Sequence, residues 1–188
     1  MKHLLVLIAA LGLSCNAIAN EYEEALKGYA NGQVKTIASD PDVIAAVKAQ
    51  NIANQNLTED QIIALDKEWR AQVAASNQPL IQEKLSNPTS KKLVGMQEAS
   101  GGKITEIFVM DDKGLNVAQS AVTSDYWQGD EAKWQKTYSV GPNAYHISEV
   151  EEDESTQMFQ SQVSYAITDP ASGKVIGAVT VGVNVEEL

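Results

Sequence analysis

The sequence predicts an α+β domain in which N-terminal helices pack on one face of an antiparallel sheet of about five strands. Two observations lead to this class. Apolar residues recur at helical spacings over the first half of the chain, and the second half changes to the period of two that β-strands show. Helices followed by a run of hairpin-connected strands favour an α+β arrangement.

Residues 1–19 are typical of an export signal. A short basic start precedes the apolar run Leu4 to Leu13, and Ala17-Ile18-Ala19 supplies the small-x-small pattern that a signal peptidase cleaves. The run is shorter than the roughly twenty apolar residues that a membrane-spanning helix needs. We therefore expect cleavage after Ala19 and a periplasmic domain that comprises residues 20–188.

A lipoprotein signal is the alternative for this leader, with Cys15 as the lipidated N-terminus. Leu13 and Ser14 are acceptable neighbours for that processing, but Gly12 stands where such signals usually carry leucine. Simple cleavage is therefore the favoured prediction. The mature chain would then contain no cysteine and no disulfide.

The chain is acidic, with 14 Lys and Arg residues against 25 Asp and Glu residues and a formal net charge of −11. This balance argues against nucleic acid and anionic membrane surfaces as partners, because their phosphate groups would repel it. The acidic run 149–154 lacks the glycine and the ligand spacing of a calcium loop. Zinc sites need clusters of His and Cys, which the sequence does not contain. We therefore expect no metal and no cofactor.

No motif indicates catalysis. The sequence contains neither a G-x-S-x-G elbow nor a phosphate-binding glycine loop, and the mature chain would offer no cysteine nucleophile. A hydrolase with paired carboxylates stays open, because spatial pairing is not visible in a sequence. We expect a protein that is not an enzyme.

The helical part is expected at residues 21–88. Apolar residues from Glu21 to Ala38 mark one helix face, and Asp40-Pro41 supplies an N-cap and a first helical position for the next helix. The stretch Thr58 to Gln61 fits a capping box in front of a strongly amphipathic helix. Asn87-Pro88 is expected to close the helical part.

The sheet part is expected at residues 93–186. The expected strands are Ile104–Met110, Leu115–Ser120, Tyr145–Val150, Gln160–Thr168 and Lys174–Val185. The segment 121–144 is a long connection, and it is the obvious candidate to cover the sheet face that the helices leave open. Long connections in compact domains are usually functional or disordered, and the aromatic content of this one argues against disorder.

The order of these pieces resembles the Cache domains, also called PDC sensor domains, which are extracytoplasmic relatives of PAS folds. Three matches carry the resemblance: the helices DPDVIAAVKAQN and LTEDQIIALDKEWR, the strand-turn-strand FVMDDKGLNVAQS, and the closing hairpin ITDPASGKVIGAVTVGVNVEEL. D-x-x-G turns are common, so the specificity lies in the order and spacing of the matches. Together they cover nearly the whole mature chain.

This resemblance implies a PAS-like sheet and a sensory role. Cache domains mostly belong to chemoreceptors and histidine kinases, and they hold small organic acids, amino acids or amines between the sheet and the long connection. Because this sequence shows no second membrane-spanning run and no output domain, we expect a stand-alone protein. It would signal through a membrane receptor or a histidine kinase, and a homodimer is compatible with the sequence.

Aromatic residues are concentrated in the long connection, where SDYWQGDEAKW at 124–134 contains two of the three tryptophans. A pocket for a small acid needs a cation or several donors, and apolar walls that exclude water. Tyr126, Trp127 and Trp134 are the expected walls, and Lys133 is the expected partner of a ligand carboxylate. In the alternative, the aromatic side chains only pack on the sheet and Lys133 is solvated.

The strands are expected to add contacts from the face beneath this connection. Phe108 and Met110 share one face of their strand because side chains alternate with a period of two. Either Tyr145 or His146 faces the pocket for the same reason. The candidates from the strands are Phe108, Met110, Ser120, Tyr145, His146, Ser161 and Gln162.

The sequence therefore predicts a periplasmic binding or sensing module for a small carboxylate, such as a short 2-oxo or hydroxy acid like pyruvate. An amine or amino-acid ligand is the alternative within the same fold, with Asp125, Asp130 and Glu131 as its candidate contacts. The alternative from another class is a ligand-free exported scaffold whose aromatic segment is only core.

Overall fold

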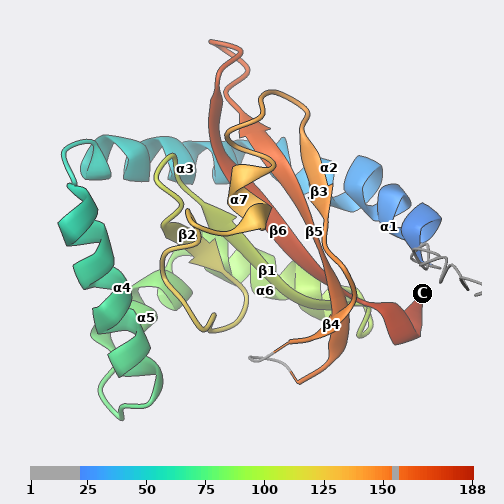
Figure 1. The fold of residues 1–188 in the computed structure, drawn as a ribbon, viewed down its shortest axis with the longest axis horizontal. Helices are drawn as coiled ribbons and strands as arrows, with labels where there is room; N and C mark the ends of the chain where they lie inside the picture. Colours follow the sequence, from blue (N-terminus) through green and yellow to red (C-terminus); the bar gives the residue numbers. More distant parts are fainter. Residues whose placement is uncertain (1–21, 154–156) are drawn as a thin grey trace, which may run out of the picture.

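The computed structural model describes residues 22–153 and 157–188. The expected export signal, its cleavage after Ala19 and the lipidation of Cys15 lie outside these residues. All but one of the α-helices precede the first strand along the described chain, and in Figure 1 some helices lie behind the sheet while others lie beside it.

The first helical segment consists of α1 (Glu23–Tyr29), a π-helical turn η1 (Ala30–Val34) and α2 (Lys35–Ala38). Leu26, Val34 and Ile37 are buried along one side of this segment and face the sheet. The apolar spacing in the sequence therefore identified the helix and the side that it buries.

Two N-caps that the sequence predicts are present. Asp40 accepts a hydrogen bond of 2.9 Å from the N–H of Asp42 at the start of α3 (Pro41–Asn54). Thr58 and Gln61 form the predicted capping box of α4 (Glu59–Val73). Both caps satisfy N–H groups that the first turn of a helix leaves unpaired.

The helical part continues beyond the predicted boundary. After α5 (Pro79–Ser86), a further helix α6 runs over Pro88–Ala99. Asn87 accepts a hydrogen bond of 2.8 Å from the N–H of Ser90, and Pro88 fits the first helical position, where its missing N–H costs nothing. The prediction that Asn87-Pro88 ends the helices was therefore wrong, since this dipeptide begins one.

Every strand pair in the sheet is antiparallel. The strand order is β2-β1-β6-β5-β3, and the two-residue β4 also pairs with β5. This agrees with the prediction of about five strands. The strands are β1 (Ile104–Met110), β2 (Asn116–Gln119), β3 (Tyr145–Ile147), β4 (Glu151–Glu152), β5 (Phe159–Thr168) and β6 (Val175–Asn184).

The two faces of the sheet are covered by different parts of the chain. Val179, Val181 and Val183 of β6 belong to the main core, together with apolar residues of α1, α3 and α6. Phe108 and Met110 point to the other face. There they pack with Trp134 of the connection between β2 and β3, residues 120–144, which we call the long connection. Helices on one face of an antiparallel sheet confirm the α+β, PAS-like class.

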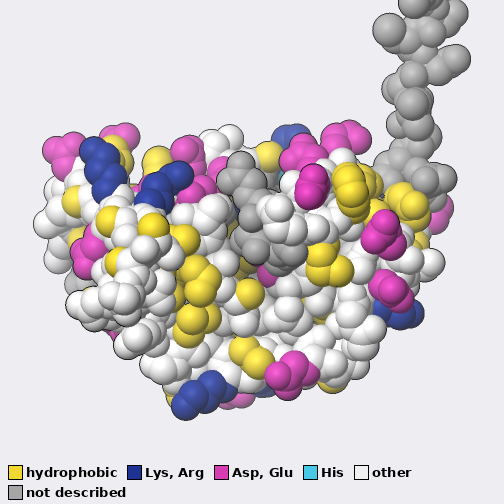
Figure 2. Space-filling model, turned by 90° about the horizontal axis from the view of Figure 1, so that it is seen from below, with side chains coloured by type: hydrophobic (Ala, Val, Ile, Leu, Met, Phe, Trp, Pro, Cys, Tyr) yellow, Lys and Arg dark blue, Asp and Glu magenta, His cyan; other side chains and the backbone are white. Residues whose placement is uncertain are grey.

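Acidic side chains are more numerous than basic ones on the face seen from below in Figure 2, in keeping with the net charge of −11. In the described part of the chain, no helix is both long and apolar enough to cross a membrane.

Candidate functional site

A cavity of about 300 Å³, which we call the polar cavity, lies between the sheet and the long connection. Three segments converge on it. The long connection contributes Ser124, Asp125, Glu131 and Lys133, the region around β4 contributes Ser148 and residues 151–153, and β5 contributes Gln160 and Gln162. Convergent polar groups in a concave site are typical of small-molecule binding.

Lys133 reaches the polar cavity from the short helix α7 (Ala132–Gln135). Its Nζ lies 2.8 Å from a carboxylate oxygen of Glu131 and donates to Oε1 of Gln128 at 3.2 Å. The same ammonium lies 5.4 Å from the centre of the Phe108 ring, a cation–π contact. Only 14% of the Lys133 side chain is exposed, so most of its length is buried under the long connection.

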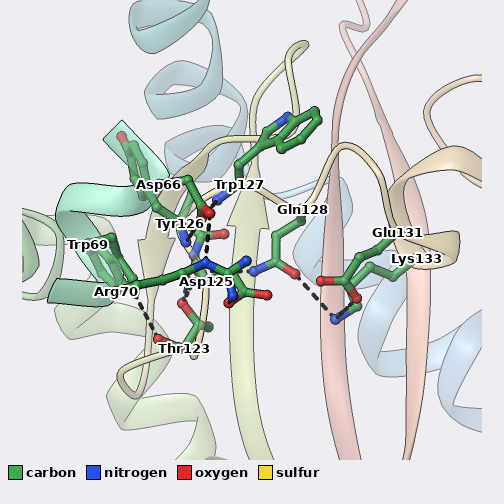
Figure 3. Close-up of polar contacts among 11 residues, drawn as sticks. Asp66, Trp69, Arg70, Thr123, Asp125, Tyr126, Trp127, Gln128, Glu131 and Lys133 are labelled. Atoms are coloured by element: carbon green, nitrogen blue, oxygen red, sulfur yellow. Dashed lines mark hydrogen bonds and ion pairs between the residues drawn. The ribbon is translucent and has the colours of Figure 1, made fainter. Parts of the chain in front are cut away.

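Helix α4 anchors the start of the long connection (Figure 3). One carboxylate oxygen of Asp66 accepts from the backbone N–H groups of Tyr126 and Trp127 at 3.0 and 3.1 Å. The indole N–H of Trp69 donates to the carbonyl of Thr123 at 2.8 Å. These bonds fix the backbone on both sides of Asp125, which lines the polar cavity.

Arg70 links the same helix to the polar cavity. Its Nε donates to Asp66 at 2.8 Å, and its Nη1 forms an ion pair with Asp125 at 2.9 Å. Burial raises the pKa of Asp125, and the positive charge of Arg70 opposes that shift. Apart from this ion pair, Oδ1 of Asp125 is buried without a hydrogen-bond donor.

The charge of the polar cavity is predominantly negative. Its described lining contains five carboxylates, from Asp125, Glu131 and residues 151–153, and one basic side chain, Lys133. A sixth carboxylate, Glu106 of β1, lies behind Gln160 and Gln162 and is 3% exposed. Burial raises the pKa of Glu106 and the charge of Asp153 adds to the rise, whereas the two amides and Lys133 oppose it.

The aromatic residues of the long connection hold it in place and do not line the polar cavity. Tyr126 is buried, and its ring stacks on that of Trp69 at 5.3 Å. Trp127 donates its indole N–H to the carbonyl of Lys113 at 2.8 Å and points away from the group around Asp125 in Figure 3. Trp134 donates to the carbonyl of Asp111 at 3.1 Å.

Two strand candidates lie beneath the long connection. Phe108 forms the base under the Lys133 ammonium, and Met110 packs with Trp134. Both are fully or almost fully buried. They therefore support the residues that line the polar cavity and do not line it themselves.

The remaining strand candidates lie elsewhere. Ser120 accepts from the N–H of Ile107 at 2.8 Å, and Ser161 donates to the carbonyl of Ser148 at 2.8 Å. Tyr145 stacks on Tyr165, a residue of the main core on the helix side. Burial lowers the pKa of His146, and the positive charge of Lys136 adds to that effect. The structure does not bring these four candidates to the polar cavity.

Sequence reasoning missed Glu106 and Gln160. Glu106 had a visible signal, because it is the only charged residue in the otherwise apolar strand ITEIFVM. Gln160 had none, since glutamine is mostly an exposed residue and its burial depends on the tertiary structure. Gln162 was a candidate and does line the polar cavity.

No group of three or more potential metal ligands occurs among residues 22–153 and 157–188. The carboxylates that line the polar cavity make it negatively charged. These carboxylates offer a ligand hydrogen-bond acceptors and negative charge. Lys133 is the one basic side chain of the described lining.

An antiparallel sheet with a polar cavity under a long connection is the arrangement that the Cache resemblance implies for a ligand-binding sensor domain. Neither a protein-family model nor a curated protein matches the sequence. Similar solved structures are sensor domains. The ligand-binding domain of the Campylobacter jejuni chemoreceptor Tlp3 in complex with 4-methylisoleucine has 15% identity and a TM-score of 0.42, over 88% of this chain and 61% of that chain.

Two further sensor domains are also similar. The sensor domain of the V. cholerae histidine kinase DctB has 13% identity and a TM-score of 0.36, over 87% of this chain and 57% of that chain. The E. coli DcuS sensor domain has 14% identity and a TM-score of 0.48, over 87% of this chain and 92% of that chain.

This chain spans about 61% of the length of the Tlp3 domain that it matches. At these identities the likeness does not extend to ligand chemistry. The Tlp3 domain belongs to a chemoreceptor and the DctB domain to a histidine kinase.

Proposed function

We propose that this chain is a periplasmic sensory module of Cache type that binds a small carboxylate in the polar cavity. The single observation that carries the proposal is the position of Lys133, whose ammonium is held at the cavity wall by Gln128, Glu131 and the Phe108 ring. An ammonium that is already fixed loses little side-chain entropy when it binds an anion. A short 2-oxo or hydroxy acid suits a cavity of about 300 Å³.

A carboxylate at Lys133 would replace or share its ion pair with Glu131. Charge-assisted hydrogen bonds are about twice as strong as neutral ones, and they are strongest where water is excluded. The ligand would therefore gain from the low exposure of the Lys133 side chain. Glu131 is more exposed, so it can turn towards solvent when a ligand arrives.

The acidic lining supports a second candidate, a ligand that carries an ammonium group. Five carboxylates of the described lining surround the polar cavity. An amine would satisfy such acceptors directly. An amino acid would satisfy both Lys133 and the carboxylates.

As part of this proposal, the module acts through a second protein, either a membrane receptor or a histidine kinase. A homodimer would be compatible with such a complex.

Thermal unfolding in the presence of pyruvate, L-lactate, L-alanine and ethylamine tests the proposal. A compound at a hundredfold its Kd stabilises the protein by about 2.7 kcal/mol, which corresponds to a rise in Tm of roughly 5–10 °C at this size. Lys133→Ala should weaken the binding of pyruvate or L-lactate about tenfold or more, because the ammonium is lost from a site with little water. Lys136→Ala, which removes an exposed lysine from the same segment, is the matched control.

Three outcomes separate the candidates. A shift with the acids that Lys133→Ala abolishes supports the carboxylate proposal, and a shift with ethylamine alone supports the amine. If no compound raises Tm and native mass spectrometry finds no small molecule on the purified protein, the ligand-free scaffold replaces both.

A further inference from the structure

Glu106 forms a polar network on the sheet surface directly behind the polar cavity. One of its carboxylate oxygens accepts hydrogen bonds from the side-chain amides of Gln160 at 2.9 Å and Gln162 at 3.0 Å. Both glutamines line the polar cavity. Because the buried Glu106 carboxylate bonds to both lining side chains, it controls the orientation of their amide groups.

The carboxylate decides which end of each amide faces the polar cavity. An ionised carboxylate only accepts hydrogen bonds, so the NH₂ ends of both glutamines must turn towards Glu106. The carbonyl oxygen of Gln160 is occupied as well, since it accepts from the hydroxyl of Thr105. The carbonyl oxygen of Gln162 is therefore the group that this surface offers to a ligand.

Gly182 of β6 provides the space for this network. A Cβ atom at position 182 would collide with Oγ1 of Thr105 and Oε1 of Gln160, and it would lie 2.8 Å from Cγ of Glu106. Because Gly182 pairs with Glu106 on one side and Gln162 on the other, its missing side chain leaves a hollow between them. The network therefore depends on the register in which β1 and β5 pair with β6.

We propose that Glu106 is a positioning residue that makes this side of the polar cavity a hydrogen-bond acceptor, so that the site selects carboxylates with an adjacent hydroxyl or ammonium donor. The carboxylate of such a ligand would bind Lys133, and its O–H or N–H would donate to Gln162. The inference rests on the proposed function and narrows it to 2-hydroxy or 2-amino acids over 2-oxo acids. Asp153 and Lys133 are the other charged groups that act on Glu106.

The first test needs no ligand. The side-chain amide signals of Gln160 and Gln162 in ¹H–¹⁵N NMR spectra should shift together as Glu106 titrates, because both amides donate to its carboxylate. The same signals should stay constant with pH in Glu106→Gln, whereas Glu149→Gln, which removes an exposed charge nearby, should behave like the wild type. Amide signals that are independent of pH in the wild type would overturn the network.

The second test compares three compounds that differ only at carbon 2: pyruvate, L-lactate and L-alanine. Wild-type protein should bind L-lactate or L-alanine about tenfold more tightly than pyruvate, which offers no donor to Gln162. In Glu106→Gln the amide of Gln162 can turn over, so the preference should fall towards equal affinity. Gln162→Met, which removes the acceptor and keeps the volume, should lose the preference as well, even if Glu106→Gln does not fold.

The possible failures are distinguishable. If none of the three compounds binds, the proposed carboxylate site is wrong and this inference falls with it. If they bind with pyruvate preferred, or with a preference that Glu106→Gln and Gln162→Met leave unchanged, only the role of Glu106 is wrong.

Discussion

Glu106 is a buried carboxylate whose ionisation opposes folding, since burial raises its pKa above the ordinary value of about 4.3. Between the pKa of the unfolded state and the higher pKa of the folded state, the native protein binds more protons than the unfolded chain. The stability that protonated Glu106 contributes is therefore fully present below the unfolded pKa, and it is lost as pH rises through the folded pKa.

Glu106→Gln should remove this loss. We expect the free energy of unfolding of the wild type to fall more steeply than that of the variant as pH rises above the ordinary glutamate pKa of about 4.3, measured by urea denaturation at a series of pH values. Glu149→Gln serves as the control. If the free energy of unfolding depends on pH in the same way in the wild type and in Glu106→Gln, burial does not raise the pKa of Glu106.

Trp69 is the residue on which the anchoring of the long connection depends most. It is fully buried, its indole N–H is bonded to Thr123, and its ring stacks on Tyr126. Trp69→Phe should cost about 1–3 kcal/mol, because the Thr123 carbonyl loses its donor in a buried site. Trp69→Ala should cost about 3–5 kcal/mol, since it also leaves a cavity. Equal stability of the wild type and Trp69→Phe in urea unfolding would contradict this assignment.

At the scale of elements, Asp66 connects helix α4 to the backbone of the long connection. Asp66→Ala should leave the N–H groups of Tyr126 and Trp127 without their acceptor, at about 1–3 kcal/mol for each group. Hydrogen exchange should then speed up at these two amides more than in β1 or β6. Lys67→Ala, an exposed change on the same helix, should leave the exchange as it is.

A general increase in exchange throughout the domain would show that Asp66 stabilises the whole fold and does not act locally. A pattern confined to the long connection would show instead that α4 controls the segment that carries Asp125, Glu131 and Lys133.

The secondary-structure elements were largely predictable because each has a local cause. The capping box at Thr58 and the hairpin around Asp111 to Gly114 involve neighbours in the sequence, so their patterns are visible there. Helix α6 was missed because Asn87-Pro88 fits both the end of one helix and the start of the next. Its start is established by the hydrogen bond from the N–H of Ser90 to Asn87, and a sequence alone does not show which way that side chain turns.

The site was predictable only in part. Lys133 was identified because it is a lone cation among aromatic residues, but Trp127 and Trp134 have the same composition signal whether they line a cavity or pack on a sheet. What separates these cases is the carbonyl groups of Lys113 and Asp111, which accept their indole N–H bonds and lie at least 14 residues away. Glu106 and Gln160 meet only through the pairing of β1 and β5 with β6, which is likewise a tertiary property.

At the scale of the whole molecule, the sheet separates the apolar core from the polar cavity. Its helix side buries a continuous apolar core, whereas its other side carries Phe108, Glu106 and the polar cavity under the long connection. The long connection, anchored by Asp66 and Trp69, keeps the polar groups in position without filling the cavity.

An NMR titration of ¹⁵N-labelled protein with L-lactate tests the central claim most directly, because it reports where a small carboxylate binds. We predict saturable shifts centred on residues 124–134 and on Gln160 and Gln162, and their loss in Lys133→Ala. Shifts centred on the cavity between α3 and α6, which Ala46, Gln50 and Lys92 help to line, would contradict a carboxylate site in the polar cavity. No shifts at millimolar L-lactate, pyruvate or L-alanine would contradict it as well.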